Sequence, residues 1–221
     1  MMVRVAVCNR RFVMRWLMAG VFPVLLLFVV SPALADSPIV RVEEDWEMVL
    51  LTPDPNSVGP QVVCAISPVG DLNSVYATFE INHGSYPKFS GGGLNLQVWN
   101  GDSHVSTQTF PNASVLTKSG ETVSWTQSME VQNGQVVFEI VNGHSATWGD
   151  FGGQGNLKAT VICSVSDLNG YSPDVSMASS GVTFASNRVA SLTLKSIRAV
   201  RADGTTVSIT VNQVVHQYTE N

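Results

Sequence analysis

Cysteine is scarce in this chain, which has three cysteines among 221 residues, at positions 8, 64 and 163. A metal centre built on cysteine needs further ligands nearby, usually other cysteines, histidines or carboxylates. The residues that flank Cys64 and the two residues before Cys163 are apolar, so they supply no such ligands. The sequence therefore predicts no metal centre at these cysteines.

Basic residues are also few, with 12 lysines and arginines against 17 aspartates and glutamates. Four of the basic residues precede Ala35 and every acid follows it, so residues 36–221 carry 8 basic and 17 acidic side chains, a net charge of −9. Nucleic acids and anionic lipids are bound by clusters of lysine and arginine. This charge balance argues against nucleic acid as a partner, and against a membrane except during export.

Signatures of catalysis are missing. The four histidines are scattered without the spacing of metal-binding pairs, and no Gly-x-Ser-x-Gly element occurs. No basic residue or helix start follows Gly152–Gly155 within its loop, which excludes a phosphate-binding loop. Glu80, Glu130 and Glu139 are candidates for the carboxylate pair of a glycosidase, but a solvated strand face is the favoured interpretation. No catalytic residue is predicted, and a hydrolase is the least favoured function.

The one long apolar run of the chain stands near its start. Four arginines precede the run from Trp16 to Val30, and Ala33-Leu-Ala35 follows it. This order is typical of an export signal peptide with a small-residue cleavage site. The run is shorter than the ~20 residues of a membrane span, which disfavours an uncleaved anchor. We predict a signal peptide over residues 1–35, a single domain over 36–221, and a periplasmic, cell-surface or extracellular location.

Four acids gather just after this segment, within Glu43-Glu-Asp-Trp-Glu47. Runs of like charge repel one another and are usually solvated. We interpret this stretch as a solvated N-terminal segment, with an interaction tail as the alternative.

Alternation of apolar and polar residues predicts β-strands throughout the rest of the chain. In the clearest case, Val75 to Asn82, four apolar residues share one face, as in a half-buried strand. Helical periodicity is absent after Ala35. Similar patterns predict strands at 61–67, 94–99, 104–110, 122–131, 135–141, 157–165, 189–202 and 205–218.

Turn dipeptides connect several of these strands. Asn100-Gly101, Asn133-Gly134 and Asp203-Gly204 are sequences of tight two-residue hairpins. Leu192 and Leu194 are out of phase with Ile197, which predicts a β-bulge near Lys195-Ser196. Many short strands joined by such turns predict an all-β fold, an antiparallel β-sandwich that is jelly-roll-like.

Removal of Cys8 with the signal peptide leaves Cys64 and Cys163 in an oxidising compartment, where pairing is the default. Each cysteine lies in phase with the buried side of its strand, so both sulfurs point into the core. The sequence predicts a disulfide between them, and two separate buried thiols are the alternative.

The stretch His144–Asn156 is rich in glycine and contains Trp148 and Phe151, which predicts a loop that a ligand approaches closely. Tyr86 and Phe89 lie in a second loop of this kind, between 84 and 93. Aromatic platforms beside amides and carboxylates bind glycans. Buried aromatics that plug the ends of the sandwich are the alternative for both loops.

Trp99 is a further candidate because it takes the opposite phase to the apolar residues of its strand, on the same face as Asn95 and Gln97. Tyr76, Glu80 and Asn82 take the outward phase of the preceding strand, so the two sets share a surface if these strands pair. A covered, ordinary core position is the alternative for Trp99. The predicted ligand-binding residues are Tyr86, Phe89, Trp99, Trp148 and Phe151.

Calcium is the only cofactor that the sequence suggests, and weakly. Asp167, Asn169 and Asp174 offer oxygen ligands on one loop, but the pattern lacks the final glutamate of an EF-hand, and an Asx turn explains it better. The leading functional hypothesis is an exported recognition module that binds a glycan or another polymer. A structural or assembly component of the cell surface, with envelope proteins as partners, is the alternative.

Overall fold

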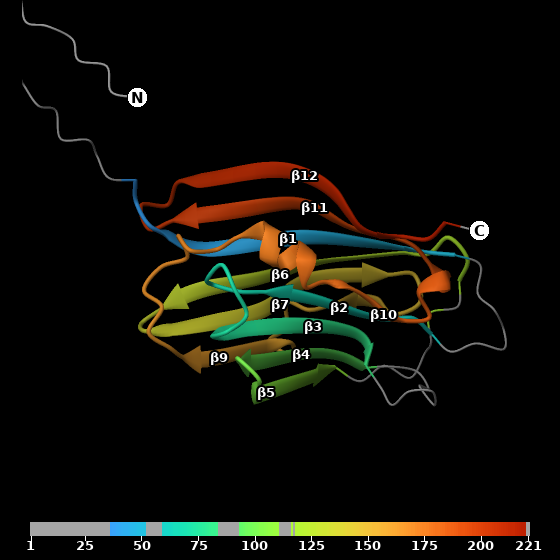
Figure 1. Cartoon of the computed structure of the whole chain (residues 1–221), viewed down its shortest axis with the longest axis horizontal. Helices are drawn as coiled ribbons and strands as arrows, with labels where there is room; N and C mark the ends of the chain where they lie inside the picture. Colours follow the sequence, from blue (N-terminus) through green and yellow to red (C-terminus); the bar gives the residue numbers. More distant parts are fainter. Residues whose placement is uncertain (1–35, 52–58, 84–92, 111–115, 117, 220–221) are drawn as a thin grey trace, which may run out of the picture. The chain divides into compact units, whose positions relative to one another are not determined.

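Two antiparallel β-sheets lie face to face in the computed structural model, which describes residues 36–51, 59–83, 93–110, 116 and 118–219 (Figure 1). The all-β antiparallel sandwich predicted from the alternation pattern is therefore confirmed. The predicted signal peptide lies outside the described residues, as do Tyr86 and Phe89.

The larger sheet has seven strands in the order β12-β11-β1-β6-β7, with β8 and β9 both paired to β7. Strand β7 is long enough to pair with β9 along its first half and with β8 along its second half. The strands are β1 (Ile39–Leu50), β6 (Thr122–Gln132), β7 (Gln135–Ser145), β8 (Gly149–Phe151), β9 (Lys158–Ile162), β11 (Val189–Arg201) and β12 (Thr206–Gln217).

The smaller sheet has five strands in the order β10-β2-β3-β4-β5. Four of them, β2 to β5, follow one another as a meander, and β10 returns after a long connection to lie beside β2, as the returning strand of a Greek key does. The strands are β2 (Gln61–Ile66), β3 (Val75–His83), β4 (Gly93–Asn100), β5 (Ser103–Phe110) and β10 (Gly181–Phe184).

The core lies between the sheets and is built from the apolar positions of alternating strands. Trp46 and Trp125 stack with 6.3 Å between ring centroids, and Phe79 of the opposite sheet packs on Trp125 at 5.6 Å. In β3 the four apolar residues in the predicted phase are all buried. Alternation therefore predicted correctly which face of this strand meets the core.

The bulge and the Asn133-Gly134 hairpin occur where the sequence predicts them, but the other two predicted turns differ. The first hairpin turns at Gly101-Asp102, because Asn100 pairs with Ser103. Of Asp203-Gly204 only Gly204 has a positive φ, and β11 ends at Arg201 while β12 begins at Thr206, so this connection is not a two-residue type I′ turn. Asn133 and Gly134 both have positive φ, 50° and 76°, as a two-residue type I′ turn requires. In the pairing of β1 with β11, Asp45 lies opposite Ser196 and Trp46 opposite Leu194, which leaves Lys195 as the extra residue. This bulge allows Leu194 and Ile197 to face the core together.

Two short helical segments interrupt the β-structure, and neither was predicted. They are α1 (Pro173–Ala178) and a single 3₁₀ turn, η1 (Ser186–Arg188). A helix of six residues is too short to show a helical period in the sequence, although the proline at its start is typical of a first helical turn. No helix in the described ranges has the length and apolar composition of a membrane span.

The acidic stretch is not a solvated N-terminal segment, and that interpretation was wrong. It belongs to β1, which pairs with β11 on one side and β6 on the other, and so lies inside the larger sheet. Glu43 points outward and forms ion pairs with Arg41 and Arg198. Glu44 points inward and has no exposed surface. The charges are tolerated because residues from distant strands neutralise or hydrogen-bond them.

Glu44 is held between the sheets by three side-chain donors. Its Oε2 accepts hydrogen bonds from Trp46 Nε1 at 2.9 Å and Gln127 Nε2 at 2.7 Å, and its Oε1 accepts one from the Tyr171 hydroxyl at 2.7 Å. Burial raises the pKa of this carboxyl, and the hydrogen bonds from its neighbours only partly oppose that effect. Burial and the nearby Glu44 charge also raise the pKa of Tyr171.

The predicted disulfide is also wrong, because Cys64 and Cys163 are both free thiols. Cys64 is buried in β2, which packs against β6, whereas Cys163 follows β9, which packs against β4 and β5. Two strand spacings separate β2 from β4, or about 10 Å. A disulfide needs Cα atoms within about 7 Å of each other, so these cysteines face one core without being neighbours.

Candidate functional site

The outer face of β3, β4 and β5 carries a patterned group of aromatic and polar side chains. Alternate residues of β3 and β4 face the core, and the residues between them face outward. Strand pairing aligns the outward residues in three rows across the sheet. We call this the aromatic-amide face, and its residues are Tyr76, Trp99 and His104, then Thr78, Gln97 and Thr107, then Glu80, Asn95 and Thr109.

The aromatic row comes from cross-strand pairing. Tyr76 of β3 lies opposite Trp99 of β4, and Trp99 lies opposite His104 of β5. The His104 ring meets Trp99 edge-on, with 5.2 Å between ring centroids and 75° between planes. His104 Nε2 lies 2.7 Å from the Thr107 hydroxyl, so the histidine is tied to the next row. Trp99 and Tyr76 are half-buried and His104 is exposed, which leaves ring surface open to solvent.

The tyrosine hydroxyl in this row is a neutral hydrogen-bonding group. Burial raises the pKa of Tyr76, and the charge of nearby Asp102 raises it further. A protonated hydroxyl both donates and accepts hydrogen bonds. Tyr76 therefore offers a ligand an apolar ring and a polar tip together.

The polar rows supply amide, hydroxyl and carboxylate groups next to the aromatics. Gln97 Nε2 donates to Glu80 Oε2 at 3.0 Å, which orients the amide across the sheet. Asn95 is only 6% exposed, and its Oδ1 has no hydrogen-bond partner. The Thr78 hydroxyl oxygen also has no hydrogen-bond partner. Buried polar atoms without partners are uncommon, so these two acceptors have unused hydrogen-bonding capacity.

The structure separates the sequence-predicted ligand residues. Trp99 lies on the aromatic-amide face, but Phe151 is 4% exposed and packs in the core against Phe79, at 6.3 Å. Trp148 is partly buried and meets Phe151 edge-on at 6.3 Å. Trp148 and Phe151 thus contact each other, on the opposite side of the five-stranded sheet from Trp99. The roles predicted for Tyr86 and Phe89 fall outside the described residues.

The glycine-rich stretch that contains Trp148 is largely hairpin rather than open loop. Strand β7 continues to Ser145, and β8 folds back on it from Gly149 to Phe151. Phe151 fits because Gly143 has no side chain; a Cβ there would lie 2.1 Å from the ring. The backbone N–H and hydroxyl of Thr147 both donate to Glu121, which fixes the turn.

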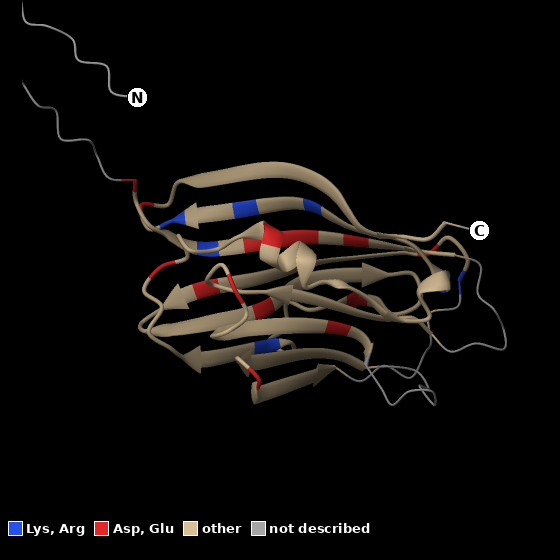
Figure 2. Cartoon of the chain, in the orientation of Figure 1, with Lys and Arg blue, Asp and Glu red and all other residues tan. Residues whose placement is uncertain are grey.

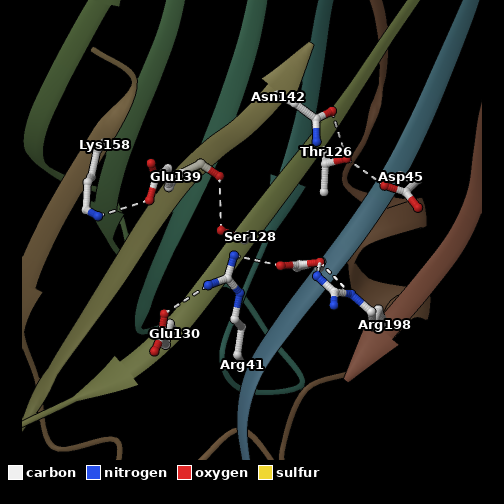
Figure 3. Close-up of polar contacts among 10 residues, drawn as sticks. Arg41, Asp45, Thr126, Ser128, Glu130, Glu139, Asn142, Lys158 and Arg198 are labelled. Atoms are coloured by element: carbon white, nitrogen blue, oxygen red, sulfur yellow. Dashed lines mark hydrogen bonds and ion pairs between the residues drawn. The ribbon is translucent and has the colours of Figure 1, made fainter. Parts of the chain in front are cut away.

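The three glutamates considered for glycosidase chemistry do not form a common site. Glu80 is on the five-stranded sheet, whereas Glu130 and Glu139 are on the outer face of the seven-stranded sheet (Figure 3). There Glu130 pairs with Arg41 at 3.3 Å and Glu139 with Lys158 at 3.0 Å. Each of these two carboxylates is already paired with a basic side chain of a neighbouring strand.

The weak calcium motif has another structural explanation. Asp167 Oδ1 accepts a hydrogen bond from the Asn169 backbone N–H at 3.0 Å, which is an Asx turn. Asn169 Oδ1 accepts one from the Ile39 backbone N–H at 3.0 Å. Among the described residues, no three histidine, cysteine or acidic side chains are grouped to hold a metal ion.

Comparison with known proteins adds no assignment. No protein family matches the chain, and no curated protein matches it in sequence. The functional argument therefore rests on the aromatic-amide face and its geometry.

Sequence reasoning identified part of this face. The alternation pattern predicted that Trp99, Asn95 and Gln97 share a face, and that Tyr76 and Glu80 lie on the same surface if the two strands pair. The pairing of β3 with β4 confirms this shared surface. Asn82 was expected there, but it has a positive φ of 56° and its side chain donates to Pro60 O instead. His104 was missed because the hairpin turns at Gly101-Asp102, one residue later than the Asn100-Gly101 pair predicted, and this turn places His104 opposite Trp99.

Proposed function

We propose that this protein is an exported, non-catalytic recognition module that binds a glycan across its aromatic-amide face. The observation that supports it most is the row of Tyr76, Trp99 and His104 beside a row of amides and hydroxyls. Aromatic ring faces stack on the apolar C–H faces of sugar rings, and neighbouring polar groups hydrogen-bond the hydroxyls.

Intrinsic tryptophan fluorescence against a panel of soluble polysaccharides tests this proposal. Trp46 and Trp125 are buried in the core, so a bound glycan changes the emission chiefly through Trp99. The Trp99→Ala variant lacks the reporting tryptophan, so its affinity is measured by isothermal titration calorimetry. It should bind at least about tenfold more weakly, because one aromatic contact in a site contributes at least ~1.4 kcal/mol. The Asn95→Ala variant should weaken binding by a smaller factor.

Tyr218→Ala is the matched control, since Tyr218 is 38% exposed and lies outside the five-stranded sheet. This variant should bind as the unaltered protein does. A panel without any response, or equal affinities for the unaltered protein and Trp99→Ala, would count against glycan binding at this face.

A further inference from the structure

Strand β12 forms the outer edge of the seven-stranded sheet and is 12 residues long. Its one partner is β11; no other strand in the described ranges pairs with it (Figure 1). An edge strand of this length presents a row of backbone N–H and C=O groups that can pair with another strand. Natural proteins usually protect such edges with charges, proline or bulges.

This edge lacks the usual protection over its first half. Between Thr206 and Gln217 there is no lysine, arginine, aspartate, glutamate or proline, and Figure 2 shows β12 without charge, whereas β11 carries basic residues and β1 carries both signs. Its pairing with β11 becomes irregular only after Thr210, at Val211-Asn212, where Asn212 has a positive φ of 49°, and again at Val215. The stretch 206–210 is therefore regular, uncharged and open to pairing.

Exposed apolar side chains are concentrated on the same strand. Val207 is 46% exposed and Ile209 57%, and four of the six large exposed hydrophobic residues in the described part of the chain are on β12 or directly after it. Val207 and Ile209 face the inner side of the sheet with Ile197 and Ala199. There they line a cavity of about 240 Å³ with Tyr171 and Pro173. Contiguous apolar surface of this kind marks an interaction site.

We propose that the partner at this edge is a second copy of the chain, which pairs antiparallel along β12 about a two-fold axis. Residues 36–221 carry a net charge of −9, so two copies repel each other at most orientations. The uncharged β12 edge is where they approach without placing like charges opposite one another. Two-fold pairing brings Val207 and Ile209 of both copies together and joins two seven-stranded sheets into one.

This inference is independent of glycan binding, because the aromatic-amide face belongs to the other sheet. It agrees with the assembly role considered from the sequence. Either proposal can fail without the other.

Sedimentation velocity of the full chain over a wide concentration range tests the inference. The unaltered protein should form a dimer, and Ile209→Lys should weaken it at least about tenfold, because a charge at the new interface loses its hydration. Val105→Lys is the matched control: Val105 is a 45% exposed valine on β5, the edge of the five-stranded sheet, and its variant should stay dimeric.

Two further measurements test whether the variants fold and whether β12 is the interface. Circular dichroism and thermal melting confirm that both variants fold, since both positions are exposed. Hydrogen exchange should show that the amides of residues 206–210 become more protected as protein concentration rises. A monomer at every concentration, a dimer unaffected by Ile209→Lys, or equal dissociation by Val105→Lys would overturn the proposal.

Discussion

Glu44 shows how far a single residue can depart from its apparent role in the sequence. It stands in a run of acids that is typical of solvated sequence, yet its side chain is buried. It accepts hydrogen bonds from Gln127 and Tyr171, which are both far from it in sequence. Burial outweighs these bonds, so its pKa is raised from the ordinary 4.5. The core thus contains a carboxyl group that is easier to protonate in the folded chain than in the unfolded one.

We predict that the difference in stability between the unaltered protein and a Glu44→Gln variant depends on pH. A raised folded pKa means that the folded chain retains a proton which the unfolded chain has released, so the contribution to stability is complete below pH 4.5 and is lost as pH rises through the folded pKa. Glu44→Gln does not titrate. The unfolding free energy of the unaltered protein minus that of Glu44→Gln should therefore fall from below pH 4.5 to neutral pH.

Urea unfolding of both proteins at the two pH values measures this difference. The comparison cancels the titration of the other carboxyl groups, which both proteins share. A difference that grows toward neutral pH would mean that the hydrogen bonds to the charged form outweigh burial.

The cysteines illustrate what residue-scale patterns cannot supply. Phase along a strand indicates which face a side chain occupies, and Cys64 does face the core as predicted. The phase does not indicate which residue lies opposite that side chain in the core, because this depends on the order of strands in both sheets. Phe151 was assigned to a ligand for a similar reason: its place in the core depends on the empty space at Gly143, which the local pattern does not reveal.

At the scale of elements, the most informative strand is β11, because its bulge at Lys195 lies next to core residues. Lys195 has no partner in β1, and its side chain forms a partly exposed ion pair with Glu47 at 3.2 Å. Such pairs contribute at most about 1 kcal/mol. The bulge preserves the inward phase of Leu194 and Ile197, and deletion of Lys195 would preserve that phase too.

Two single-residue deletions should therefore differ sharply. Deletion of Lys195 should cost little stability, whereas deletion of Thr193, which is paired with Glu47, moves Leu192 or Leu194 out of phase with the core. Exposing one such leucine costs about 2 kcal/mol, so the second deletion should be less stable by at least ~2 kcal/mol. Urea unfolding midpoints measure the difference, and similar midpoints would show that the bulge has another role.

Elements with a local code were predicted well, and those that depend on distant partners were not. Asn133-Gly134 specifies its hairpin because both residues adopt positive φ readily. Strand β1 was missed because Glu44 interrupts its apolar alternation, and the groups that make this acceptable come from β6 and from the segment before α1. Of the candidate site, Trp99 and its amides followed from alternation, whereas His104 required the strand register.

At the scale of the whole molecule, the net charge of −9 over residues 36–221 should oppose association at every surface. Salt screens repulsion between exposed like charges, with a Debye length of about 10 Å at 0.1 M. The β12 dimer buries no charged residue of that strand, so it should tighten as ionic strength rises. Sedimentation at low and high sodium chloride measures this; a dimer that salt dissociates would instead be held by ion pairs.

The position of β1 in the larger sheet also determines when that sheet can form during synthesis. This strand is synthesised before the other strands of residues 36–221. Glu47 can form its ion pair with Lys195 only after 148 further residues have been synthesised. Until then Trp46 and Met48 lack their partners in β11, Leu194 and Leu192. The seven-stranded sheet therefore cannot be completed until β11, close to the end of the chain, has been synthesised.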